Sequence, residues 1–184
     1  MTKQEARAWA KAQRKLLDMQ AVGRSMAEGL FPLPCWQQAD TVLAFAAMPD
    51  EPDTSLILRR TLADGKRLLL PRVLSRTAMD WVEIPDLQLL RPGAYGILEP
   101  PADLPACDPA GAAAPLALIP CLAAGPDGVR LGRGGGYYDR FLAQYKGRRL
   151  LLCPAAVLRP GLPCDAWDAR FAPGEILTEK GILQ

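Results

Sequence analysis

The chain has 184 residues and a mass of 19.9 kDa, the size of one domain, and its 49% hydrophobic residues are enough for a real core. A formal net charge of +2 provides no basic field over the whole chain, which argues against nucleic-acid binding. The sequence contains no histidine, which excludes Ser-His-Asp and Cys-His catalysis and argues against a structural zinc site.

The cysteines and the N-terminus indicate the compartment. An odd number of cysteines without a Cys-x-x-Cys pair is typical of reduced thiols; they are Cys35, Cys107, Cys121, Cys153 and Cys164. The N-terminal segment is charged and amphipathic, and no apolar run approaches the length of a membrane span. We therefore expect a soluble, cytoplasmic protein with no membrane partner.

Two helices are predicted over roughly residues 2–31. Thr2 and Glu5 have the spacing of a capping box, so the first helix begins there and extends to about residue 17. Its apolar side is expected to carry Trp9, Ala12 and Leu16. The second helix is expected over about residues 21–30, because two prolines follow it.

A strand–helix–strand rhythm follows. Residues 41–47 are β-branched and aromatic, as in a buried strand, and Thr54 is expected to cap a helix that Gly65 ends. Residues 68–73 predict the next strand, and the alternation in 80–84 is typical of an edge strand. This order favours a parallel α/β sheet.

The second half continues the pattern. The segment 91–115 is rich in Pro, Gly and Ala and is interpreted as a long ordered loop. Further strands are predicted over 116–119, 150–153 and 175–178, with a helix over 138–145. We expect a single three-layer α/β/α domain over residues 1–184, with a mostly parallel sheet and ligands at the carboxyl ends of its strands.

The stretch from Gly125 to Leu142 is the most distinctive, with six glycines, three arginines and two adjacent tyrosines. Glycines let the backbone approach a ligand, and amides at a helix start bind anions. The stretch matches neither the Walker loop, since Tyr137 follows Gly136, nor the Rossmann glycine pattern. A flexible linker rarely interleaves Arg, Tyr and Asp so densely. The residues alone predict a phosphate or nucleotide loop, with Asp139 available to a metal.

The run from Arg130 to Asp139 closely resembles the signature of the 5-formyltetrahydrofolate cyclo-ligase family, whose members are also called 5,10-methenyltetrahydrofolate synthetases. The resemblance extends in order over nearly the whole chain. Its other parts are Lys3 and Arg7, the segments 48–54 and 92–100, Trp167-Asp168, and residues 178–181.

The resemblance implies a NagB/RpiA/CoA-transferase-like α/β fold and a reaction. ATP and 5-formyltetrahydrofolate give 5,10-methenyltetrahydrofolate, ADP and phosphate, with Mg²⁺, through a phosphorylated iminium at N5. Such phosphoryl transfer needs mainly positioning and charge neutralisation, which suits a chain without histidine. We expect a monomer that acts on these small molecules and not on nucleic acid.

The resemblance also assigns residues. Arg133 and Tyr137 are the expected catalytic residues. The expected ATP contacts are Lys3, Arg7, Arg130, Leu131, Gly132, Arg133, Gly134, Gly135, Gly136, Tyr137 and Tyr138. The expected folate contacts are Met48, Asp53, Tyr95, Arg133, Gly134, Gly135, Gly136 and Tyr137. The expected magnesium ligands are Asp139 and Asp168.

Simpler interpretations of these residues stay open. The basic first helix reads equally as a solvated face, Asp53 as a helix cap, Tyr95 as a half-buried loop residue, and Asp139 as a favourable charge at a helix start. Gly135 stands where some family members carry Lys, and residues 153–157 lack the polar groups often found there. Alternatives for the whole chain are a non-catalytic folate- or nucleotide-binding relative, an RNA-binding module and a sugar-phosphate isomerase.

Overall fold

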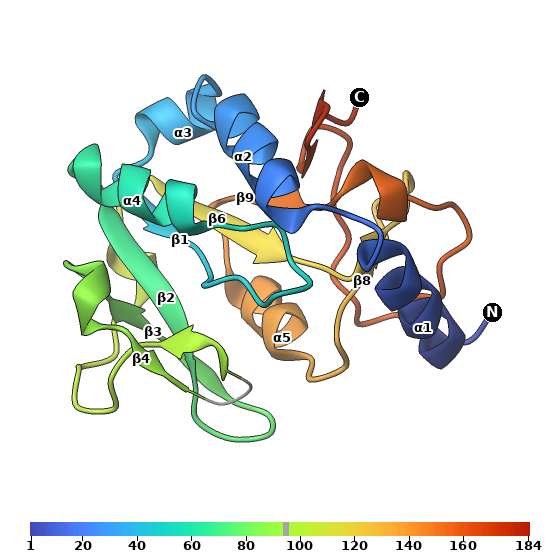
Figure 1. Ribbon diagram of the computed structural model, residues 1–184. Helices are drawn as coiled ribbons and strands as arrows, with labels where there is room; N and C mark the ends of the chain where they lie inside the picture. The colour runs from blue at the N-terminus through green and yellow to red at the C-terminus, as the bar shows by residue number, and fades with distance from the viewer. Residues whose placement is uncertain (94–95) are drawn as a thin grey trace.

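The computed structural model, which describes residues 1–93 and 96–184, is built around a seven-stranded sheet in the order β11-β10-β9-β6-β1-β2-β3 (Figure 1). The inner strands from β10 to β2 are parallel, and β3 and β11 are antiparallel at the edges. Their bounds are β1 Thr41–Leu43, β2 Arg67–Val73, β3 Met79–Glu83, β6 Pro115–Pro120, β9 Arg148–Leu152, β10 Ile176–Thr178 and β11 Gly181–Ile182. The expected mostly parallel α/β sheet is confirmed.

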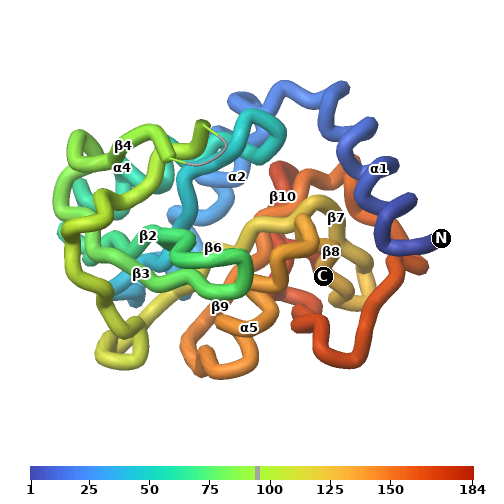
Figure 2. Tube along the Cα trace, turned by 90° about the horizontal axis from the view of Figure 1, so that it is seen from below, coloured from blue at the N-terminus to red at the C-terminus, as the bar shows by residue number. Residues whose placement is uncertain are grey.

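Helices cover both faces of this sheet. Their bounds are α1 Lys3–Arg14, α2 Met19–Leu30, α3 Pro34–Gln38, α4 Ser55–Ala63 and α5 Tyr137–Gln144. Figure 1 shows α2, α3 and α4 over one face and α5 below the other, and Figure 2 shows α1 beside β7 and β8 at one end. The three expected layers are present.

The two apolar cores follow from strand geometry, because alternate side chains of a strand point to opposite faces. Val42 packs in the core under α2, α3 and α4, and its neighbour Leu43 packs in the core of the opposite face. Leu68 and Leu69 divide in the same way between the two cores. The inner strands are therefore apolar throughout, as parallel strands covered on both faces are.

Short elements complete the chain. Outside the main sheet lie the two-residue strands β4 Arg91–Pro92, β5 Leu98–Glu99, β7 Ala123–Ala124 and β8 Arg130–Leu131, which pair as β4–β5 and β7–β8. Single turns of 3₁₀ helix include η1 Leu87–Leu89, η3 Pro109–Gly111 and η4 Ala155–Val157. The segment 91–115 thus contains short elements between its loops.

The prediction for the buried face of α1 was wrong, although its capping box at Thr2 is present. The helix ends at Arg14, and it buries Ala6, Ala10 and Arg14, whereas Leu16 is 80% exposed. Small alanines let the helix approach the β7–β8 ribbon closely. Of the three residues expected on the apolar side, Trp9 packs at the margin of the core, whereas Ala12 and Leu16 are exposed.

Other parts of the first half of the chain also differ from expectation. α2 begins at Met19 because the Asp18 side chain accepts hydrogen bonds from the amides of Gln20 and Ala21. β1 ends at Leu43, and α3 was not predicted. Thr54 occupies the N-cap position of α4, but its hydroxyl donates to the carbonyl of Phe45 instead of capping the helix.

The strand order places two loops side by side. β1 lies between β2 and β6, so the chain leaves β1 toward one side of the sheet and later returns on the other. Clefts form at such a switch point, at the carboxyl ends of the strands. The loops 44–54 and 121–136 follow β1 and β6 there. Within the described part of the chain, no helix has the length and apolar character needed to cross a membrane.

Candidate active site

The structure divides the glycine-rich stretch that begins at Gly125 into two parts with different roles. Gly125 and Gly128 form the turn between β7 and β8, where the Gly128 amide donates to the Gly125 carbonyl at 3.0 Å. Gly128 has a φ of 83°, and a Cβ there would lie 1.9 Å from the Phe171 carbonyl oxygen. Glycine is therefore required at this turn by the fold. The first part of the run is structural.

The second part, which we call the glycine loop (residues 132–136), leads directly into α5. Gly136 is the N-cap of α5 with a φ of 67°, and Gly134 has a φ of 105°. These left-handed conformations suit glycine and leave the amides at the helix start uncovered by side chains. The loop is thus built to receive an anion.

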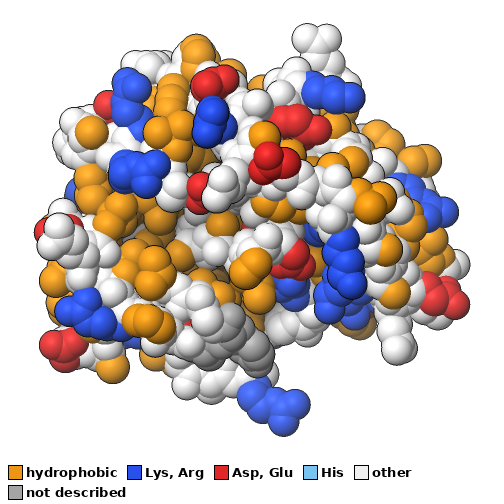
Figure 3. Space-filling model, viewed as in Figure 1, with side chains coloured by type: hydrophobic (Ala, Val, Ile, Leu, Met, Phe, Trp, Pro, Cys, Tyr) orange, Lys and Arg blue, Asp and Glu red, His pale blue; other side chains and the backbone are white. Residues whose placement is uncertain are grey.

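A cavity of about 500 Å³ opens on the glycine loop. Most of the residues that the sequence assigned to ATP and metal meet here. Its lining is Lys3, Arg7, Arg130, Leu131, Gly132, Gly134, Gly135, Gly136, Asp139, Arg140, Ala143, Asp165, Trp167 and Asp168. Figure 3 shows Lys and Arg side chains over α1, on the right of the molecule.

Arg7 and Arg130 form the cationic wall of the cavity. Arg7 reaches from α1 and donates through Nε to the Gly132 carbonyl at 3.0 Å. Arg130 is 5% exposed and pairs with Asp139 at 2.9 Å. Its buried Nε has no hydrogen-bond partner among the described residues. Such unsatisfied buried N–H groups are rare in folded proteins.

Lys3 closes one end of the cavity with two carboxylates. Its Nζ lies 2.6 Å from Asp165 and 2.5 Å from Asp168. Burial by itself lowers the Lys3 pKa, but the hydrogen bonds to both carboxylates outweigh it and raise the pKa. For Asp168, burial by itself raises the pKa. The hydrogen bonds donated by Lys3 and by the Asp165 amide outweigh burial and lower the pKa of Asp168 below its usual value. Lys3 and Asp168 are therefore both charged at neutral pH.

Two carboxylates in the lining are candidate metal ligands. Asp139 Oδ1 accepts from Arg130 and, at 3.3 Å, from the Ala169 amide, and Asp168 is held by Lys3. Over residues 1–93 and 96–184, no cluster of three or more metal-ligating side chains is found. The arrangement fits Mg²⁺, which takes one or two carboxylates and completes its shell with phosphate and water.

Arg133 lies outside the lining and turns toward the loop after β1. Its guanidinium is 2.5 Å from Asp50 and 3.1 Å from Glu51, and Glu51 is buried. Glu51 also accepts from the Met48 amide at 3.0 Å. Arg133 therefore joins the glycine loop to the loop that follows β1.

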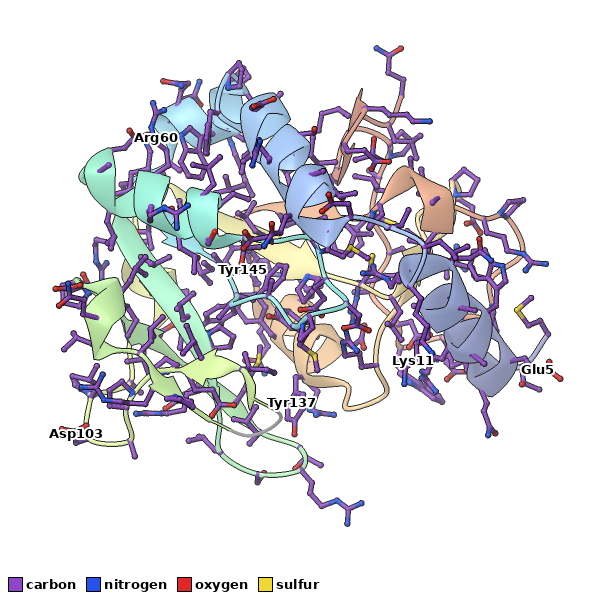
Figure 4. All side chains as sticks on the ribbon, in the orientation of Figure 1. Glu5, Lys11, Arg60, Asp103, Tyr137 and Tyr145 are labelled. Carbon is purple, nitrogen blue, oxygen red and sulfur yellow. The ribbon has the colours of Figure 1, made fainter. Side chains whose placement is uncertain are left out.

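The two tyrosines point in different directions. Tyr137 donates from its hydroxyl to the Ser75 carbonyl at 2.7 Å, at the end of the β2–β3 hairpin (Figure 4). Tyr138 packs edge-on against Trp81 under the loop, and burial raises its pKa. Neither side chain lines the cavity. A Cβ on Gly135 would lie 2.6 Å from the Tyr137 ring, so a larger residue there requires the ring to move.

Two of the residues assigned to folate, Met48 and Asp53, lie in the loop after β1, which Arg133 contacts through Asp50 and Glu51. Met48 is half-buried in the loop after β1, and Asp53 accepts from both the amide and the hydroxyl of Ser55 at 2.9 Å. Asp53 thus has the local bonding expected of a helix cap, while each of its oxygens retains acceptor capacity. Tyr95 lies outside the described residues.

Sequence reasoning missed Arg14, which ties the two loops together. This fully buried guanidinium donates to the carbonyls of Leu122, Cys121 and Asp50, at 2.8, 2.6 and 2.7 Å. Its position seven residues after Arg7, two turns along the same helix, was an available signal. Also missed were the carboxylates Asp50 and Glu51 and the cavity residues Arg140, Asp165 and Trp167.

The fold and the site define an α/β protein with a cationic, glycine-lined anion site at a switch point of its sheet. The model of the 5-formyltetrahydrofolate cyclo-ligase family matches residues 2–178, so the chain belongs to this family. Among its relatives is the 5-formyltetrahydrofolate cyclo-ligase of Escherichia coli, 29% identical over 91% of this chain and 92% of that protein.

Two further comparisons agree. The enzyme of the same name from Mycolicibacterium smegmatis is 37% identical over 55% of this chain, a match that spans 54% of that relative. The solved structure of Aquifex aeolicus 5,10-methenyltetrahydrofolate synthetase superimposes with a TM-score of 0.84 at 27% identity, covering 100% of this chain and 93% of that one. The resemblance noted from the sequence is confirmed.

Proposed function

We propose that this protein catalyses the ATP-dependent conversion of 5-formyltetrahydrofolate to 5,10-methenyltetrahydrofolate, with release of ADP and phosphate. The observation that carries the proposal is the cavity in which the glycine loop meets Lys3, Arg7 and Arg130, in a chain of the cyclo-ligase family. Backbone amides at a helix start together with three cations are the donors that a triphosphate requires.

In this proposal the glycine loop and the start of α5 bind the phosphates. Arg7 and Arg130, which both line the cavity, neutralise the charge of the phosphates. Lys3 approaches from the end of the cavity, where Asp165 and Asp168 hold it. Leu131 adds an apolar side chain to the lining of the cavity, and Tyr138 packs against Trp81 near the start of α5.

The reaction needs no protein nucleophile. The formyl oxygen attacks the γ-phosphorus, the bond to ADP breaks, and a phosphorylated iminium forms at N5. N10 then attacks the formyl carbon and closes the ring, and phosphate leaves with the former formyl oxygen while N10 releases its proton, so that the inorganic phosphate departs as HPO₄²⁻. The protein contributes alignment and charge neutralisation, as in other phosphoryl transfers.

Arg133 and Tyr137 are proposed to act at the boundary between the two substrates. Arg133 is attached to both the glycine loop and the loop after β1, through Asp50 and Glu51, which suits a group that stabilises charge on the transferred phosphoryl. Met48 and Asp53 then face folate on the far side. Tyr95 stays a predicted stacking residue.

Mg²⁺ is proposed to bind through Asp139 and Asp168, which line the same cavity as the glycine loop. When bound, it neutralises charge on the ATP phosphates. Because Arg130 and Lys3 already hold these carboxylates, each is oriented before the substrate arrives. We further propose that the protein works in the cytoplasm as a monomer.

The test follows methenyl product by absorbance while ATP, Mg²⁺ and 5-formyltetrahydrofolate are supplied. We expect turnover that requires all of them, and a loss of kcat on the order of 10² in Arg133→Ala. Arg60→Ala, a surface change on α4, is the control and should keep the wild-type rate. Tight folate binding without turnover would assign the chain to the non-catalytic alternative, and a normal kcat in Arg133→Ala would refute the role of that residue.

A further inference from the structure

Trp167 is a large aromatic side chain that the fold leaves in solvent. It is 77% exposed, yet it lines the cavity beside the glycine loop. The other three tryptophans are occupied: Trp9 lies under Arg159, Trp36 is buried and donates to Asp64, and Trp81 packs against Phe141. Within the described part of the chain, Trp167 has no stacking or cation–π partner.

The turn that carries Trp167 is held in place. The Asp168 amide donates to the Asp165 carbonyl at 3.1 Å, and the Asp165 amide donates to the Asp168 carboxylate at 2.8 Å. Lys3 bonds both carboxylates and anchors the turn to α1. The indole is therefore presented to the cavity from a fixed backbone, and its position does not depend on a loose loop.

The cavity has two chemically distinct sets of lining groups. Amides of the glycine loop and the guanidinium groups of Arg7 and Arg130 suit phosphates. The apolar lining comes from Leu131, Ala143 and Trp167, of which Trp167 alone offers an aromatic face. A volume of about 500 Å³ exceeds what a triphosphate alone fills, and falls in the range of cavities that take drug-sized ligands.

We propose that Trp167 stacks on the adenine base of ATP and so completes the nucleotide site. This inference rests on the proposed function and extends it to the base, which none of the assigned contacts addresses. Stacking on a tryptophan suits a neutral planar base and is tolerant of its identity, since every base has a π-face. Trp167 thus provides affinity for the nucleoside, and the glycine loop provides affinity for the phosphates.

The experiment compares Trp167→Ala and Trp167→Phe with the wild type, and uses Leu16→Ala as a control at another exposed apolar residue. Loss of one base stack corresponds to a roughly tenfold higher KM for ATP in Trp167→Ala. Trp167→Phe retains an aromatic face and should recover much of this affinity. Neither variant should change kcat or the KM for 5-formyltetrahydrofolate.

Inorganic tripolyphosphate separates the base from the phosphates. As a competitor of ATP, it should have the same inhibition constant in all three proteins, because it never reaches the indole. A parallel loss of ATP and tripolyphosphate affinity would instead show that Trp167 only supports the Lys3 turn, and would overturn the proposal. A KM for ATP within twofold of wild type, or a changed KM for folate alone, would overturn it as well.

Tryptophan fluorescence tests the stack without turnover. ATP and ADP should quench an exposed indole in the wild type and leave Trp167→Phe unchanged, whereas tripolyphosphate should quench neither. If the wild type shows this quenching but no product formation, the stacking stands and the proposed reaction fails. The reaction stands and the stacking fails if product forms but ATP does not quench the fluorescence of the wild type. The same conclusion follows if product forms and ATP quenches Trp167→Phe as strongly as it quenches the wild type.

Discussion

Glu51→Gln tests the contact that joins the loop after β1 to the glycine loop. Glu51 is 6% exposed, and its two oxygens each accept one hydrogen bond, from Arg133 Nε at 3.1 Å and from the Met48 amide at 3.0 Å. Glutamine keeps one acceptor but replaces the other with an NH₂ group. One of the two donors is then left facing another donor in a buried position.

The size of the effect follows from this geometry. A hydrogen bond to a charged group contributes roughly 1.5–3 kcal/mol, so we expect Glu51→Gln to lower the free energy of unfolding by about 2 kcal/mol. The same change releases Arg133 on one side. A loss of about 1.4 kcal/mol in transition-state stabilisation corresponds to a tenfold lower kcat, and we expect a decrease of that order.

Asp50→Asn is the matched control, because Asp50 holds the same arginine from a more exposed position. The side chains of Asp50 and Arg133 are 35% and 32% exposed, and such pairs contribute about 0–1 kcal/mol. Urea unfolding and steady-state kinetics measure both variants. The reasoning is refuted if Glu51→Gln matches the wild type in both measurements, or if Asp50→Asn is the more damaging change.

Two further predictions concern the carboxylates of the cavity. Asp139→Asn leaves Arg130, whose side chain is 4% exposed, without its anionic partner. We expect this variant to lose up to about 3 kcal/mol of stability and to require more Mg²⁺ for activity. An unchanged Tm would contradict the first expectation, and an unchanged Mg²⁺ titration would contradict the second. The lowered pKa of Asp168 implies stabilisation that is complete above the ordinary carboxyl pKa of 3.8 and is lost as the pH falls through the lowered pKa. Wild type should therefore exceed Lys3→Met in its free energy of unfolding at neutral pH, and this difference should shrink as Asp168 is protonated at acid pH. Urea unfolding at several pH values measures it, and a difference that grows on acidification would count against the Lys3–Asp168 pair.

Local signals in the sequence were sufficient for much of the fold. The Thr2–Glu5 capping box, the apolar runs of the inner strands and the glycines before α5 all act within a few residues, and each gives the observed element. Edge elements such as β11 and β5 have only two residues. Pairing partners far along the chain, and not local propensity, define such elements.

In the candidate site, too, some residues follow from local sequence signals and others depend on contacts between distant parts of the chain. Lys3 and Arg7, one helical turn apart, line the cavity as their spacing suggests. The pairing of Arg133 with Asp50 and Glu51 spans 83 and 82 residues of sequence, and depends on the placement of β1 next to β6. The Pro126-Asp127-Gly128 sequence was the local signal that sets Gly125 apart from Gly132, since it is typical of a turn and Gly125 belongs to a hairpin turn whereas Gly132 lines the cavity.

The strand order explains why one arginine joins the glycine loop to the loop after β1. Since β1 and β6 are neighbours, the loops that follow them meet, and Arg14 fixes this meeting by donating to the carbonyls of Asp50 and Leu122. Arg133 then bridges from the glycine loop, the proposed ATP side, to Glu51, which also holds the backbone of Met48 on the proposed folate side. A ligand that moves either loop must therefore change the surroundings of Arg133. Through Glu51, the position of Arg133 is thus tied to the backbone on the proposed folate side.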